Sequence, residues 1–275
     1  EYNERRHAAD DRAYVRRQAE VDDTYNEVIL ASIRRSLGCE LQAELSHEGQ
    51  QALDSLRSVT TNSIQRLASE LYAEEIHFVM ELIQNADDNL YTAEGNEEEW
   101  TVRSLPSLKL VLMHDRLRIC NNELGFTEAN VSALCSIGRS TKRKAEGGYI
   151  GHKGIGFKAV FKVTDTPTIH SKQFHFCFDK RKELGYIVPI AMRSPTGWHA
   201  CNRGTVIDLP YVQDASDDGV HDKQCSAHFL LEMKRKLRDI PPSLLLFLNR
   251  LRSIEVIDVL ATTRRTLSME ASGDF

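Results

Sequence analysis

The chain has 275 residues, of which 41% are hydrophobic and 27% are charged, and this composition is typical of a globular protein. The composition excludes collagen-like, coiled-coil and disordered chains, and no apolar run approaches the roughly 20 residues of a membrane helix. The net charge of −5 does not indicate a nucleic-acid partner, and we expect no membrane partner.

The six cysteines are scattered, without a Cys-x-x-Cys pair or the Cys and His spacing of a metal site. Reduced thiols are typical of cytosolic and nuclear proteins, so we expect one of these two compartments. The first residue is Glu1, without a methionine or an apolar leader, and this start indicates a fragment of a longer protein.

Residues 1–60 have a charged, helical pattern without catalytic motifs. Apolar residues recur along one helical face over residues 22–37, Gly38 is a plausible stop, and a weaker helix is predicted over residues 40–57. We expect a helical extension that packs on the rest of the chain. The alternative is an interaction arm through which the chain forms a homodimer.

From residue 62 onward, helices come first and strands follow. Two helices carry Ile64 to Tyr72 and Ile76 to Ile83, and a third begins at its N-cap Thr127. The remaining predicted elements are an antiparallel hairpin at 108–113 and 116–120, strands at 168–170, 174–178, 186–190 and 206–209, helices at 227–238 and 242–250, and a strand at 253–260. This order predicts an α+β two-layer sandwich over residues 61–265, followed by a tail over residues 266–275.

A first polar motif lies near the end of the predicted helix that contains Ile83. Glu81, Asn85 and Asp88 have the spacing that places side chains on one helical face. Two carboxylates and an amide oxygen on one stripe suit a hydrated magnesium ion and the activation of water. The alternative is a solvated helix face.

Two further motifs follow. Residues 121–126, Asn-Asn-Glu-Leu-Gly-Phe, come directly after a strand and either face a ligand or form an Asx-type turn. Residues 147–156 contain five glycines before an apolar stretch, which lets backbone N–H groups approach phosphate. The spacing matches neither G-x-x-x-x-G-K-[ST] nor the dinucleotide motif G-x-G-x-x-G. The basic residues Arg139, Lys142, Arg143 and Lys144 precede it and suggest a cationic flap.

In this order the motifs resemble the nucleotide-binding boxes of the GHKL superfamily, which includes gyrase B, the ninety-kilodalton heat-shock chaperone, histidine kinases and MutL. Residues 81–88 resemble the E-x-x-x-N-A-x-D box, residues 151–156 the G-x-x-G-x-G box, and residues 204–207 the G-T-x-[IV] strand. Within the superfamily the chain looks most like the branch that contains sacsin and NO VEIN. The resemblance implies the Bergerat-type fold, with ATP and Mg²⁺ as ligands.

The resemblance also implies a role for individual residues. Glu81 would be the general base for water, Asn85 the magnesium ligand, and Asp88 a supporting residue. Thr205 would reach the adenine through water, and residues 138–150 would form a lid over the triphosphate. The other expected nucleotide-binding residues are Asn121, Gly125, Arg139, Ser140, Lys142, Gly151, Lys153, Gly154, Ile155, Gly156 and Phe157.

The chain departs from the family pattern at the base-binding motif. Asn121 stands where the superfamily has an aspartate that accepts the adenine amino proton, and Glu123 stands where it has the first glycine. An amide can turn either its oxygen or its NH₂ toward a base, so we hypothesise weaker selectivity between ATP and GTP. Glu123 either adds negative charge to the pocket or points to solvent.

The resemblance favours an ATP-binding module that hydrolyses ATP slowly with magnesium. Lid closure would drive a conformational change in a larger chaperone-like or nucleic-acid-associated protein. A downstream domain of the same protein would complete the site, so we expect weak hydrolysis by this fragment. The alternative is a nucleotide-gated interaction or dimerisation module with negligible turnover. A scaffold with a decayed site is disfavoured because Glu81, Asn85 and the three glycines of residues 151–156 are all present.

Overall fold

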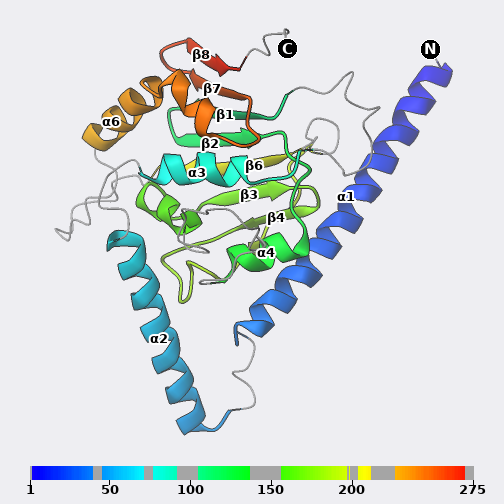
Figure 1. The fold of residues 1–275 in the computed structure, drawn as a ribbon. Coiled ribbons are helices and arrows are strands. Elements are labelled where there is room, and N and C mark those ends of the chain that lie inside the picture. The colour runs from blue at the N-terminus through cyan, green and yellow to red at the C-terminus, as the bar shows by residue number, and fades with distance from the viewer. Residues whose placement is uncertain are drawn as a thin grey trace.

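The N-terminal part of the chain forms two long helices, which flank the rest of the molecule (Figure 1). The computed structural model describes residues 2–39, 45–70, 77–91, 105–136, 156–196, 198, 204–211 and 227–269. Helix α1 (Tyr2–Ser36) ends next to Gly38, whose φ of +76° confirms the expected stop. Asn26 joins α1 to strand β4 (Phe174–Cys177), because its side chain donates to the carbonyl of His175 and accepts from that residue's N–H.

The second helix corrects the sequence analysis. Helix α2 (His47–Glu70) is continuous where we expected two separate helices, and the expected domain boundary at residue 60 lies inside it. The stretch around that boundary is polar and offers little hydrophobic periodicity. The hydroxyls of Thr60 and Ser63 bond to the carbonyls four residues earlier, so these polar residues stay within the helix.

A single mixed sheet forms the centre of the described structure. Its strands run in the order β5-β4-β3-β6-β2-β1-β7-β8, and all neighbours are antiparallel except the parallel pair β1–β7. The remaining strands are β1 (Ser107–Leu112), β2 (Arg116–Asn121), β3 (Thr168–Ser171), β5 (Ile190–Ala191), β6 (Thr205–Pro210), β7 (Ser253–Asp258) and β8 (Thr263–Ser268). Helices and this sheet together confirm the α+β class.

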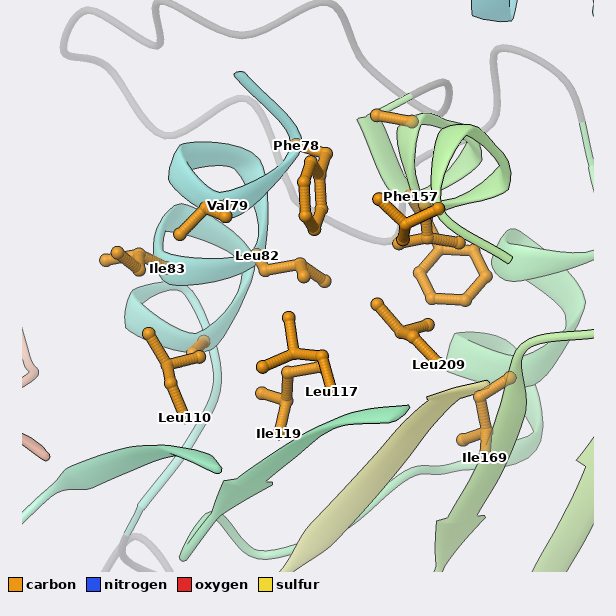
Figure 2. Close-up of a cluster of buried hydrophobic side chains, with 14 of the residues drawn as sticks. Phe78, Val79, Leu82, Ile83, Leu110, Leu117, Ile119, Phe157, Ile169 and Leu209 are labelled. Carbon is orange, nitrogen blue, oxygen red and sulfur yellow. The ribbon is translucent and has the colours of Figure 1, made fainter. Parts of the chain in front are cut away.

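Short helices cover one face of the sheet. They are α3 (His77–Asp87), α4 (Glu128–Leu134), η3 (Gly156–Lys162), α6 (Ala227–Arg238) and η4 (Pro242–Phe247). Figure 2 shows Phe78 and Leu82 of α3 and Phe157 of η3 pointing toward Leu117 and Leu209 of the sheet. Thr127 caps α4, as expected, and the structure adds a capping box with Asn130. The core therefore lies between α3, η3 and the central strands.

Three expected elements differ from the structure. Residues 186–187 lie in a turn rather than a strand, because the N–H groups of Ile187 and Val188 both bond to the carbonyl of Leu184, whose φ is +51°. The helix expected at 242–250 is the shorter 3₁₀ helix η4. Strand β8 was not expected, and it ends at Ser268 inside the segment that we predicted to be a tail.

The opposite face of the sheet carries charged side chains in cross-strand pairs. Arg118 on β2 donates to both carboxylate oxygens of Asp208 on β6, at 2.7 and 2.9 Å, and Lys109 on β1 lies 3.4 Å from Glu255 on β7. The candidate site lies on the helical face instead.

In the described part of the chain, no helix combines the length and hydrophobicity needed to cross a bilayer.

Candidate functional site

Helix α3 presents the first motif of the site. Leu82, Ile83 and Ala86 are buried against the sheet, whereas Glu81 and Asn85 are half-buried. This division is the one that the helical spacing predicts. It leaves a carboxylate and an amide one turn apart on the side of α3 that does not fill the core.

Helix η3 begins at Gly156, directly against this side of α3. A Cβ at Gly156 would overlap Oε2 of Glu81 and would lie 3.9 Å from Nδ2 of Asn85. Position 156 therefore has no room for a side chain while Glu81 keeps this conformation. The structure therefore places the last glycine of the glycine-rich motif beside the functional groups of the first motif.

The C-terminal end of α3 is fixed by Asp87, which the sequence analysis passed over. Its buried carboxylate accepts hydrogen bonds from the backbone N–H groups of Asn249 at 2.8 Å, Arg250 at 2.7 Å and Leu251 at 2.8 Å. The adjacent Asp88, which we expected to support the site, lies beyond the helix end, and its carbonyl accepts from the Arg250 guanidinium at 3.1 Å. Asp87 therefore holds the helix that carries Glu81 and Asn85.

A row of polar side chains lies at the ends of three neighbouring strands. Asn121 of β2 is paired with Thr205 of β6, and Thr205 is paired with Ser171 of β3. These three residues are buried. Successive side chains of a strand point to opposite faces of the sheet, and the charged side chains point to the face opposite the helices. The three polar residues occupy the alternate positions, so they lie on the helical side. The hydroxyls of Ser171 and Thr205 are 2.6 Å apart. Ser171 is a further residue that the sequence analysis missed, and the strand register is the observation that reveals it.

Glu123 extends this row and answers the question left open by the sequence. Its side chain is buried, and Thr205 donates its hydroxyl proton to Oε1 at 2.5 Å. Burial raises the pKa of Glu123 to about 7, against the opposing effects of the Thr205 hydrogen bond and the positive charge of Lys172. Glu123 thus faces the polar row and not the solvent.

Tyr91 connects the two parts of the site. Its hydroxyl donates to the carbonyl of Ala86 at 2.7 Å and accepts from Nδ2 of Asn121 at 3.0 Å. Burial, followed by the negative charge of Glu123, raises the pKa of this phenol, which stays protonated at neutral pH. The α3 end and the strand ends are therefore linked by a neutral donor and acceptor that no sequence motif had indicated.

Two further expected site residues have described positions. Gly125 has a φ of +88°, and a Cβ there would lie 2.6 Å from Cγ of Lys172, so both backbone conformation and space favour glycine. The Phe157 side chain belongs to the core, with its ring 6.1 Å from that of Phe178, so only its backbone is available to a ligand. The expected contacts Arg139, Ser140, Lys142, Gly151, Lys153, Gly154 and Ile155, with the lid at 138–150, lie outside the described residues.

The arrangement offers two kinds of chemistry on one side of the sheet. The carboxylate of Glu81 and the amide oxygen of Asn85 are hard donors, which suit magnesium and can orient a water molecule. The hydroxyls of Thr205 and Ser171, with the carboxyl of Glu123, suit a ligand rich in hydrogen-bonding groups.

Comparisons with known proteins place the chain among large relatives. Residues 58–189 match the model of the Sacsin domain. The chain is 37% identical over 248 residues to Protein NO VEIN of Arabidopsis thaliana, and 29% identical over 119 residues to Sacsin of Homo sapiens. These alignments cover 84% and 40% of this chain, but only 8% and 2% of the two relatives. The matches support the expected relation to the sacsin and NO VEIN branch.

Proposed function

We propose that this sacsin-related domain binds ATP with Mg²⁺ and hydrolyses it slowly. The observation that carries the proposal is the position of Gly156, where a side chain would overlap the Glu81 carboxylate and would reach the Asn85 amide. Glu81 and Asn85 belong to one of the two motifs that resemble the phosphate end of a nucleotide site, and Gly156 belongs to the other. The polar row at Asn121 and Thr205 supplies the hydrogen-bonding groups for a base.

Each residue has a chemical task in this proposal. Glu81 orients a water molecule and accepts its proton, as a general base does. Asn85 supplies an oxygen ligand to magnesium, which when bound neutralises phosphate charge. The absence of a side chain at Gly156 leaves room for the Glu81 carboxylate beside the N-terminal end of η3. The cationic residues Arg139, Lys142 and Lys153 would contact the phosphates.

Nucleotide binding is tested by calorimetric titration with a non-hydrolysable ATP analogue, with and without Mg²⁺. The chain should bind in a magnesium-dependent manner, and Asn85→Ala should lose that dependence. Gln84→Ala is the matched control, since Gln84 is the exposed neighbour on the same helix. Absence of binding by the parent chain, or equal binding with and without Mg²⁺, would refute the proposal.

Turnover is tested separately from binding. Glu81→Gln keeps the shape of the side chain but removes its basicity, so hydrolysis should fall by about 100-fold while the analogue still binds. Binding without measurable turnover by the parent chain would favour the nucleotide-gated interaction module. In either case we propose that closure of the lid transmits the nucleotide state to a following domain of the whole protein.

A further inference from the structure

Glu123 differs from the other buried acidic residues of the described structure. Asp208 is paired with Arg118, Glu255 with Lys109 and Arg264, and Asp258 with Arg238, whereas Asp87 accepts three backbone N–H groups. Glu123 is buried to 6% exposure, and among the described residues its side chain has one hydrogen-bond donor, the Thr205 hydroxyl, and no ion-pair partner. A buried carboxyl group with so little compensation destabilises the fold, and such positions are typical of ligand sites.

The neighbouring Asn121 is fixed in one orientation. Its Oδ1 accepts the backbone N–H of Glu123 at 2.7 Å, which forms the Asx-type turn, and its Nδ2 donates to Tyr91. A flipped amide would place its NH₂ against a backbone N–H, which can only donate. The amide flip that we invoked for weak base selectivity is therefore opposed by the fold.

The same turn directs Glu123 toward the polar row. The residue after Asn121 leaves the strand, and Glu123 turns back to meet Thr205, which is the strand partner of Asn121. Oε1 accepts from Thr205, and the second carboxylate oxygen, Oε2, has no hydrogen-bond donor among the described residues. A carboxylate acceptor thus lies beside position 121, although residue 121 itself carries an amide.

We propose that Glu123 selects the base of the nucleotide, with its carboxylate accepting a hydrogen bond from the C6 amino group of adenine. This inference rests on the proposed nucleotide function and names the base that the site prefers. For two bases held in the same orientation by a common triphosphate position, adenine presents its C6 amino group, which donates to a carboxylate, whereas guanine presents its C6 oxygen, which a carboxylate repels. The chain therefore prefers ATP over GTP, and Thr205 acts by holding the Glu123 carboxylate in place.

The test compares the β,γ-imido analogues of ATP and GTP by calorimetry at pH 8, where Glu123 is ionised, in the presence of Mg²⁺. The parent chain should bind the ATP analogue at least about tenfold more tightly, the value of one charge-assisted hydrogen bond. Glu123→Gln should bring the two dissociation constants to within about threefold, because the Gln amide both donates and accepts. A ratio that stays unchanged in Glu123→Gln, while both proteins bind, would overturn the inference.

Two further variants complete the experiment. Glu255→Gln is the matched control, since Glu255 is a buried glutamate on the opposite face of the sheet, and it should keep the parental ratio. Thr205→Val removes the donor that holds Glu123, so it should also reduce the ratio and serves if Glu123→Gln does not fold. If the parent chain binds neither analogue, the proposed function itself fails, and this result is distinct from binding without base preference.

Discussion

The backbone of Gly156 lies so close to the carboxylate of Glu81 that a Cβ at position 156 would overlap Oε2. Because this oxygen ends a flexible side chain, Gly156→Ala should displace Glu81 and cost only about 1–2 kcal/mol of unfolding free energy. The displaced carboxylate should no longer orient water, so hydrolysis should fall by about as much as in Glu81→Gln. Urea unfolding and a steady-state hydrolysis assay measure the two effects.

Gly49→Ala is the matched control for this prediction. A Cβ at Gly49 would lie 3.4 Å from Oγ of Ser46, an ordinary contact near the start of α2, so this change should stabilise the helix by about 0.5–1 kcal/mol without affecting activity. The double variant with Gly156→Ala and Glu81→Gln should be no less active than either single variant. Additive losses of activity would show that Gly156 acts independently of Glu81.

A second prediction concerns the contribution of Asp87 to the free energy of unfolding. Asp87→Ala removes the acceptor of three backbone N–H groups, at Asn249, Arg250 and Leu251, and leaves these donors unsatisfied. We expect a loss of about 3 kcal/mol in the free energy of unfolding. Gln84→Ala, at an exposed position of α3, is the control and should cost less than about 1 kcal/mol. Equal losses in the two variants, measured by urea unfolding, would contradict the anchoring role of Asp87.

Local signals predicted much of this fold correctly. The cap at Thr127, the hairpin of β1 and β2, and helix α6 are all confirmed, because each depends on residues close together in the chain. The helical spacing of Glu81 and Asn85 also predicted which side of α3 avoids the core. Such patterns are readable because burial on one face imposes a period on the sequence.

The features that could not be predicted from the sequence depend on tertiary contacts. Strand β8 is a charged edge strand whose residues are mostly exposed, so it carries no hydrophobic alternation, and its pairing with β7 stabilises it. Ser171 became a site residue only through its register with Thr205. The direction of the Glu123 side chain depends on the Asx turn and on a strand far away in the sequence.

The pKa of Glu123 makes a third prediction, on the pH dependence of stability. The native state keeps this proton up to about pH 7, whereas the unfolded chain releases it near the ordinary value of 4.5. Between these pH values the native state binds more protons, so stability falls as pH rises. Glu123→Gln should lack this contribution and should gain up to about 3 kcal/mol relative to the parent chain above pH 7.

Thermal or urea unfolding of both proteins at pH 5 and pH 8 measures this difference. The gap in the free energy of unfolding should be small at pH 5 and largest at pH 8. Glu48→Gln, at an exposed position in α2, is the control and should give a constant difference. A gap between Glu123→Gln and the parent chain that shrinks with rising pH would contradict a buried carboxyl with a raised pKa.

For Lys158 in η3 we predict a contribution to stability that changes with pH in the opposite direction to that of Glu123. Its side chain is buried, its ammonium donates to the carbonyl of Leu134 at 2.5 Å, and it lies 4.6 Å from the centre of the Phe178 ring. Burial lowers the pKa of Lys158 to about 8 from 10.5. Between these values the unfolded chain binds more protons, so this contribution to stability increases with pH.

Lys158→Met keeps most of the side-chain volume and removes the buried charge. At pH 7 the Lys158→Met variant should therefore be about 1–3 kcal/mol more stable than the parent chain. The upper value is the full effect of the pKa shift, and the lower value allows for the lost hydrogen bond to Leu134. The advantage should disappear above pH 10.5, where the parental lysine is neutral in both states. Lys236→Met, on the exposed face of α6, should show no such trend. A stability gap that is independent of pH would mean that Lys158 is not desolvated in the native state.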